Sequence, residues 1–201
     1  MKKILTICLI SMFLPAGMQA QKAYLEGKKV IFDLSVEAGM PAEAVTSTRK
    51  YIGNFTPGTS ASGATYDEMG SMNATVYKKL EIAPKDISTG GDLSGSNAAT
   101  QPWVDAFNYC KNLNYEGNGW RLPTQRELML IYMFRPAFDK LIETLMVNTQ
   151  SPFADAHYWS ATEYRNEPGK AWFVDFANGL TSSADKTYPT EKRMRCVREV
   201  E

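Results

Sequence analysis

The sequence predicts an α+β fold, and two observations support this prediction: the order of the expected elements and a change in the spacing of apolar residues. Apolar side chains recur at helical spacing between residues 100 and 146, whereas from Tyr158 onward they alternate with a period of two. The expected order is strand, helix, helix and then several short strands. This order favours two main helices, a short-stranded antiparallel sheet and an N-terminal β extension over a parallel doubly wound sheet.

The N-terminus has the features of a secretory signal peptide over residues 1–20. A basic start is followed by an apolar run from Ile4 to Leu14, and small or polar residues lead to Ala20, after which we expect cleavage. The apolar run is too short for a membrane span. Cys8 lies within it with no small residues ahead, which disfavours a lipid anchor. The mature chain is therefore expected in the periplasm, at the cell surface or outside the cell.

Charge and cysteine content narrow the classes of function. Removal of the signal peptide takes away Lys2 and Lys3, so 22 basic and 22 acidic side chains become 20 and 22, a formal charge of −2. This balance gives no indication of binding to nucleic acid or to an anionic membrane.

Only Cys110 and Cys196 then remain, which indicates one disulfide, with two buried free thiols as the alternative. Since His157 is the only histidine, a Cys/His zinc site is disfavoured.

The N-terminal part is expected to form strands separated by turn-rich loops. Residues 24–36 alternate well enough for one strand, and residues 76–82 repeat the pattern less cleanly. Glycine- and serine-rich loops are expected at residues 57–63 and 88–99. We place a boundary near residue 72, which gives a signal peptide over 1–20, a β-rich extension over 21–71 and a main domain over 72–201.

The first expected helix begins near Thr100, a plausible cap, with Pro102 in its first turn. Its apolar face comes from side chains at helical spacing, and two glycines end it. The apolar residues are Trp103, Ala106, Phe107, Cys110 and Leu113, and the glycines are Gly117 and Gly119.

The second expected helix begins with a capping box, in which the Thr124 hydroxyl accepts from the Glu127 amide and the Glu127 carboxylate accepts from the Thr124 amide. Pro136 ends or bends this helix. A further short helix is expected over residues 138–146. After Tyr158, short strands follow, with a tight turn at Asn178-Gly179 and a last strand over residues 193–200.

Several ordered motifs together resemble the DUF1566 family, which includes the C-terminal module of the Legionella collagen-like adhesin and exported proteins of Bacteroides-type bacteria. The resemblance covers about residues 72–201. The motifs are Tyr109-Cys110, Gly119-Trp120-Arg121-Leu122-Pro123-Thr124 with Glu127-Leu128, Tyr158-Trp159-Ser160-Ala161-Thr162, Ala171-Trp172-Phe173-Val174-Asp175-Phe176 with Asn178-Gly179, and Arg195-Cys196-Val197-Arg198.

The resemblance implies a C-type-lectin-like fold, distantly related to the formylglycine-generating enzymes, in which a disulfide joins the first long helix to the last strand. Cys110 and Cys196 lie in those two elements. Those enzymes hold copper with a further pair of cysteines, so their oxidase chemistry does not transfer to this chain. Calcium-binding lectins carry a Glu-Pro-Asn type phrase, whereas this chain has Glu167-Pro168-Gly169, and glycine offers no side-chain oxygen. No cofactor is therefore predicted, although a structural cation bound elsewhere is left open.

Three sets of candidate site residues have a structural interpretation that we favour. Trp120, Trp159 and Trp172 could stack on sugar rings, but large aromatic residues are usually buried. Arg121 and Glu127 lie at one helix start, where Glu127 already has a capping role. His157 could act as a general base, but no Ser, Cys or carboxylate stands at a recognisable spacing to form a relay with it, so a surface histidine is favoured. The carboxylates Asp155, Glu163 and Asp175 raise the idea of a glycosidase pair, which only their separation in space can test.

The expected ligand surface is the polar and aromatic segment 163–170, between two strand-like runs, with a solvated connection as the alternative. The residues predicted to bind ligand are Tyr164, Arg165, Asn166, Glu167 and Tyr188. No catalytic or metal-binding residue is predicted.

These observations predict an exported, non-enzymatic binding or adhesion-type module, with an extracellular glycan or a surface protein as partner. A structural or accessory subunit of a surface fibre is the alternative, with strands 24–36 and 76–82 making the intermolecular contact. A glycan hydrolase ranks third. Homo-oligomer formation is left open.

Overall fold

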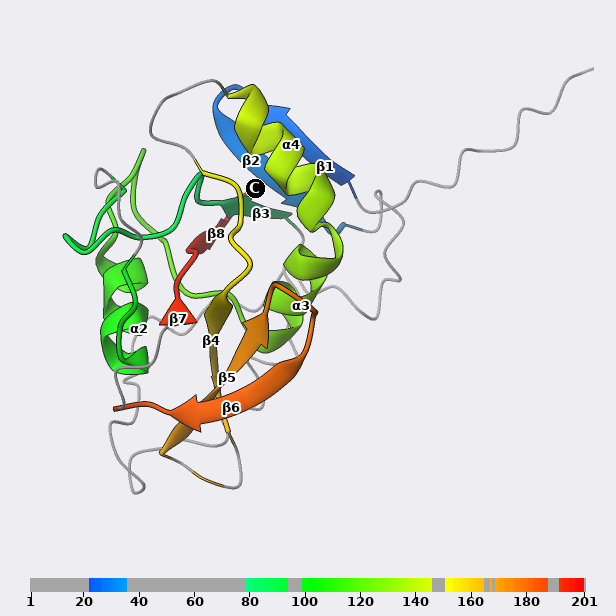
Figure 1. The fold of residues 1–201 in the computed structure, drawn as a ribbon. Coiled ribbons are helices and arrows are strands. Elements are labelled where there is room, and N and C mark those ends of the chain that lie inside the picture. Colours follow the sequence, from blue (N-terminus) through cyan, green and yellow to red (C-terminus); the bar gives the residue numbers. More distant parts are fainter. Residues whose placement is uncertain are drawn as a thin grey trace, which may run out of the picture.

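The computed structural model describes residues 22–35, 79–93, 99–145, 151–164, 167, 169–187 and 192–200. These residues form three helices and two four-stranded sheets, so the predicted α+β class is confirmed, with the strands divided between two sheets (Figure 1). The predicted signal peptide, the loop 57–63 and the boundary near residue 72 lie outside the described residues, and the division into domains stays a prediction.

The first sheet has the strand order β1-β2-β3-β8, and all its pairs are antiparallel. Its strands are β1 (Lys22–Glu26), β2 (Lys29–Asp33), β3 (Lys79–Ile82) and β8 (Val197–Glu199). The expected single strand over 24–36 is wrong, because the chain reverses at Gly27-Lys28 and Gly27 adopts a φ of 61° that favours glycine. β3 is paired on both sides, so a new chain could not add to it, whereas β1 lies at an edge of the sheet (Figure 1).

The second sheet has the order β6-β5-β4-β7, and only the β4–β7 pair is parallel. Its strands are β4 (His157–Glu163), β5 (Lys170–Asp175), β6 (Thr181–Asp185) and β7 (Lys192–Arg193). The expected single strand over 193–200 is wrong, since β7 and β8 belong to different sheets. Between them the chain bonds to the segment after β3 instead, where Ile87 N–H donates to the Met194 carbonyl and Ala83 N–H to the Cys196 carbonyl.

The turn between β5 and β6 is the predicted Asn178-Gly179 turn. Gly179 has a φ of 79°, and its N–H donates to the Asp175 carbonyl at 2.7 Å. The Asn178 side chain accepts from Leu180 N–H at 2.9 Å. The turn lies against Tyr132, whose ring leaves no space for a Cβ atom at Gly179. Both the backbone conformation and the close approach therefore require glycine here.

Gly179→Ala is accordingly expected to lower the free energy of unfolding by about 1–3 kcal/mol, because alanine disfavours this φ and its Cβ would lie 2.5 Å from a Tyr132 ring carbon. Urea unfolding of the purified mature chain measures the effect. Gly27→Ala is the matched control, since Gly27 has a similar φ of 61° but no atom within 4 Å of the added Cβ. Equal losses for the two variants would show that the Tyr132 contact contributes nothing.

The helices are α2 (Trp103–Asn112), α3 (Gln125–Met133) and α4 (Arg135–Thr144). The predicted capping box at Thr124 is present and begins α3. Thr100 is not a cap, because α2 begins after Pro102, and α2 ends at Asn112, before the two glycines. α4 begins three residues earlier than the predicted 138, because Pro136 falls in its first turn, where a missing N–H costs nothing.

Two apolar clusters form the core. The first packs α2 against the loops around it and one face of the second sheet, and the second lies where α3 and α4 pack against both sheets. The first contains Trp103, Phe107, Trp120 and Trp159, and the second contains Phe32, Phe138, Tyr158 and Phe176. In the described part of the chain, no helix is long and apolar enough to cross a membrane.

A disulfide joins Cys110 of α2 to Cys196, directly before β8, with a Cα–Cα distance of 5.4 Å. The prediction of one disulfide between these residues is confirmed, and the alternative of two free thiols is wrong. The cross-link ties α2 to the residue directly before β8.

Candidate functional site

The loop between β4 and β5 is the predicted ligand surface, and its described residues are held by backbone hydrogen bonds. Tyr164 N–H donates to the Lys170 carbonyl and Lys170 N–H to the Glu167 carbonyl, both at 2.8 Å. Among the five predicted ligand residues, Tyr164 and Glu167 are described. Arg165, Asn166 and Tyr188 lie outside the described residues.

Tyr164 lies beside Trp172 of β5, and we call these two residues the aromatic ledge. Their ring centroids are 5.1 Å apart at 79°, an edge-to-face arrangement, and both side chains are half-buried. Sequence reasoning named Trp172 only as one of three tryptophans and did not pair it with Tyr164. The proximity of Tyr164 and Trp172 could have been predicted, because a short loop between two antiparallel strands brings the residues on either side of it together.

The other tryptophans belong to the core. Trp103 and Trp159 are fully buried and Trp120 is 2% exposed, so the favoured interpretation is confirmed for Trp120 and Trp159. Each indole N–H is bound internally: Trp103 donates to the Ser160 carbonyl, Trp120 to the Tyr115 carbonyl and Trp159 to the Gln101 carbonyl. Trp172 is thus the one tryptophan of the four that is half-buried rather than buried.

Charged residues at the rim of the aromatic ledge are paired. Lys170 Nζ lies 2.6 Å from Glu167 Oε2, and this hydrogen bond raises the pKa of Lys170. Glu167 is exposed, so the rim offers a carboxylate and an ammonium to solvent beside the two rings. Together these groups can stack on an apolar ring face and exchange hydrogen bonds with hydroxyl groups.

A buried ion pair supports the ledge from beneath. Glu163, the last residue of β4, accepts from Lys186 Nζ, and both side chains are fully buried. Burial lowers the pKa of Lys186, against the opposing effect of Glu163, and its ammonium lies 4.8 Å from the centroid of the Trp103 ring. Ser160 Oγ also donates to the Trp172 carbonyl at 2.9 Å. These contacts fix the backbone on which Tyr164 and Trp172 are carried.

Comparison with protein families gives a match over most of the chain. The sequence model of the family described as the Lcl C-terminal domain matches residues 73–198. The chain belongs to this family. The aromatic ledge, both disulfide cysteines and all three helices lie within the matched residues, whereas the β1–β2 hairpin lies before them. No curated protein matches the chain. Membership in the family suggests an adhesion-type module.

The charged motif residues of this Lcl C-terminal domain are structural. Arg195 donates to Asp86 at 2.7 Å, and Arg198 donates to Glu81 at 2.7 Å while lying 4.6 Å from the centroid of the Trp120 ring. Burial raises the pKa of Glu81, partly offset by Arg198. These contacts hold β3 and the segment after it against β8, so Arg195 and Arg198 belong to the scaffold of the fold.

Arg121 and Glu127 do form a pair, and it is part of the same scaffold of the Lcl C-terminal domain. Two guanidinium N–H groups of Arg121 donate to the two oxygens of Glu127, at 2.7 and 2.8 Å, and Nε donates to Glu199 at 2.9 Å. Burial disfavours the charged guanidinium, but the two carboxylates outweigh it and raise the pKa of Arg121. With 1% exposure, Arg121 is closed to ligands, as the structural interpretation expects.

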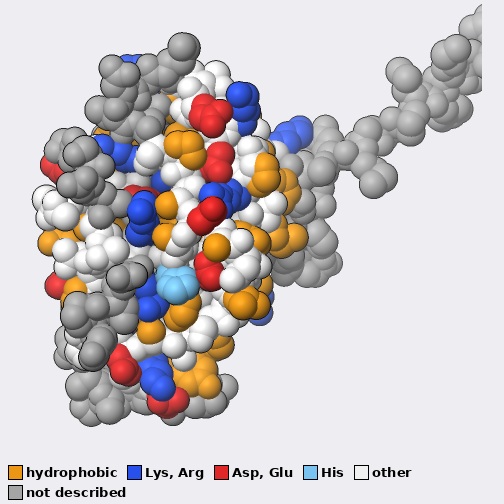
Figure 2. Space-filling model, viewed as in Figure 1, with side chains coloured by type: hydrophobic (Ala, Val, Ile, Leu, Met, Phe, Trp, Pro, Cys, Tyr) orange, Lys and Arg blue, Asp and Glu red, His pale blue; other side chains and the backbone are white. Residues whose placement is uncertain are grey.

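The carboxylates weighed as a glycosidase pair each lie beside a different basic side chain. Glu163 pairs with Lys186, Asp155 with Arg135, and Asp175 lies 3.7 Å from His157 Nε2. The only histidine is 45% exposed and appears in pale blue on a surface where acidic and basic side chains are interspersed (Figure 2). Among the described residues, no group of three or more His, Cys, Asp and Glu side chains could hold a metal ion.

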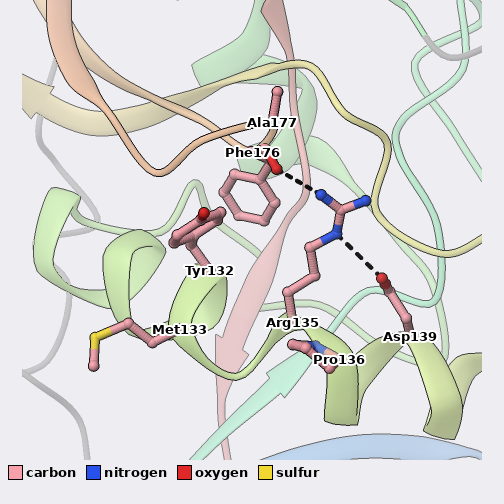
Figure 3. Close-up of a pocket in the computed structure, with 7 residues that line it drawn as sticks. All are labelled: Tyr132, Met133, Arg135, Pro136, Asp139, Phe176 and Ala177. Carbon is pink, nitrogen blue, oxygen red and sulfur yellow. Dashed lines mark hydrogen bonds and ion pairs between the residues drawn. The ribbon is translucent and has the colours of Figure 1, made fainter.

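The domain also has a depression of about 540 Å³ between the end of α3, α4 and the β5–β6 turn (Figure 3). Its lining residues are Tyr132, Met133, Arg135, Pro136, Asp139, Phe176 and Ala177. The Arg135 guanidinium is engaged by Asp139, Asp155 and the carbonyls of Phe153 and Phe176. Its donors therefore serve to tie α4 to the second sheet, and the depression is lined by both polar and apolar surface.

Proposed function

We propose that this Lcl C-terminal domain is an exported, non-enzymatic adhesion-type module that recognises an extracellular glycan at the aromatic ledge. The observation that carries this proposal is that Trp172 is only half-buried and lies beside Tyr164, while the other three tryptophans are buried. Aromatic rings present a flat, polarisable face to the apolar C–H face of a pyranose ring.

The chemistry of the rim supports a sugar over an apolar ligand. A pyranose has hydroxyl groups around its edge, and Glu167 and Lys170 lie at the rim of the ledge with one acceptor and one donor group. Trp172 lies on β5, which is paired on both sides, and Tyr164 is held at the start of the loop by its N–H bond to the Lys170 carbonyl, which keeps the ordering cost of binding low. A glycan is therefore favoured over a surface protein, which would bury a larger continuous area.

Trp172→Ala is expected to weaken glycan binding by about fivefold, because loss of one aromatic stacking contact costs on the order of 1 kcal/mol. The measurement is a glycan array with mature wild-type protein, followed by titration calorimetry of the best ligand against wild type and variant. Trp172→Phe, which keeps an aromatic face, is expected to retain most of the affinity.

Leu180→Ala is the matched control, because Leu180 is another exposed hydrophobic side chain, 68% exposed, on the β5–β6 turn. It should leave the affinity unchanged. An array without any bound glycan, or equal affinities of wild type and Trp172→Ala, would contradict the proposal. Release of shorter sugars from a bound glycan during incubation would contradict the non-enzymatic part and favour a hydrolase.

A further inference from the structure

Strand β1 is an open edge of the first sheet. In the sheet order β1-β2-β3-β8, the described strands place β2 on one side of β1 and none on the other (Figure 1). The strand is short, with Lys22 and Glu26 exposed at its ends and three half-buried residues between them. Unpaired strand edges carry free backbone donors and acceptors and are sites of strand addition.

The hairpin register shows which backbone groups of β1 point to the open edge. Glu26 pairs with Lys29 across the two-residue Gly27-Lys28 turn. The pair that closes such a turn exchanges hydrogen bonds, and bonded and non-bonded pairs then alternate along the ladder. The N–H and C=O groups of Ala23 and Leu25 therefore point away from β2, toward the open edge.

We propose that β1 of one chain pairs antiparallel with β1 of a second copy, about a two-fold axis through Tyr24. In this register Ala23 of each chain lies opposite Leu25 of the other, so all the outward N–H and C=O groups on these two residues find partners. If the two-fold axis passed through Ala23 or Leu25 instead, some of these outward N–H and C=O groups would have no partner. This interface goes beyond the proposed glycan site, which lies in the other sheet.

Charge complementarity supports the same register. Lys22 of one chain lies opposite Glu26 of the other, at both ends of the paired strands. The hairpin itself already uses this pattern, with Lys22 opposite Asp33 and Glu26 opposite Lys29. A parallel arrangement in register would place Lys22 against Lys22 and Glu26 against Glu26, so the charges select the antiparallel one.

The side chains between the charges also fit. Ala23 and Leu25 pack on the second core cluster, on the face of the sheet covered by α4, so Tyr24 points to the opposite face. Tyr24 then meets Tyr24 of the second copy at a non-hydrogen-bonded position, where opposite side chains come closest. The dimer has one continuous sheet and carries two aromatic ledges, which allows two-site attachment to a repeating glycan.

A charge-swap experiment on the mature chain tests the register. Sedimentation velocity should show a dimer for wild type and loss of that dimer for Lys22→Glu and for Glu26→Lys, since each variant places like charges opposite one another across the two-fold axis. An equimolar mixture of the two variants should regain the dimer, because every cross-chain pair is then opposite in charge.

The two variants are matched, because each also reverses one charge pair within the hairpin, at Asp33 or Lys29. Circular dichroism melts check that both remain folded. If either unfolds, Ala23→Pro replaces them: it removes one outward N–H without removing a β1–β2 hydrogen bond, and a folded monomer is expected. A monomeric wild type, a mixture of charge variants that stays monomeric, or dimeric Ala23→Pro would overturn the proposal.

Discussion

Removal of the Cys110–Cys196 disulfide is expected to lower the free energy of unfolding of the mature chain by about 4–5 kcal/mol. The bridge spans 86 residues, and closing a loop of that length removes much of the conformational entropy of the unfolded chain. The loss is comparable to the whole stability of many domains of this size, so the reduced chain is expected to be at the limit of folding.

Urea unfolding of wild type and of the Cys110→Ala/Cys196→Ala variant measures this loss. Reductant provides the internal control, because it should destabilise wild type and have no effect on the variant, from which both mature cysteines are absent. Unfolding midpoints that coincide for oxidised wild type and the variant would show that the bridge does not stabilise the fold.

Glu127→Ala is expected to lower the free energy of unfolding by about 3–5 kcal/mol, because it leaves the buried Arg121 guanidinium without its main partner. The same carboxylate accepts from Thr124 N–H at 2.8 Å, so the start of α3 loses half of its capping box as well. The measurement is again urea unfolding of the mature chain.

Two variants separate the ion pair from the cap. Thr124→Ala removes only the hydroxyl cap and should cost about 1 kcal/mol. Arg121→Met/Glu127→Leu removes both charges while filling the space, and should regain much of the stability that Glu127→Ala loses. If Thr124→Ala costs as much as Glu127→Ala, the cap rather than the ion pair accounts for the effect.

Features that depend on neighbouring residues could be predicted from the sequence. The Thr124–Glu127 capping box, the Asn178-Gly179 turn and the helix boundary at Pro136 each arise from contacts within a few residues, and all three are present. The disulfide was also predictable, because only two of the three cysteines lie outside the predicted signal peptide. Local hydrogen bonding and residue count are enough for such features.

Features that depend on distant partners could not be predicted. The apolar alternation continues across Gly27-Lys28, so residues 22–33 resemble one strand until the turn is seen. The split of the last strand into β7 and β8 follows from the bonds of residues 194–196 to residues 83–87, more than a hundred positions earlier. No periodicity within either segment contains that information.

The sequence predicted where the candidate site lies, but not which aromatic side chains form it. The polar segment after β4 indicated the loop, whereas the exposure of Trp172 could not be separated from that of Trp120 and Trp159, because all three lie in similar apolar phrases. Burial depends on what packs over each ring: α2 and its loops cover Trp120 and Trp159, and neither core cluster of the described residues includes Trp172.

The position of β8 has a consequence for biogenesis. Val197–Glu199 complete the sheet beside β3, and Cys196 must be made before its bridge can form, so the native topology needs residues 196–199. Such long-range pairing makes folding slow to begin. A chain that stalls on the ribosome before residue 199, or that a protease cuts before Cys196, lacks both the bridge and the last strand of the first sheet.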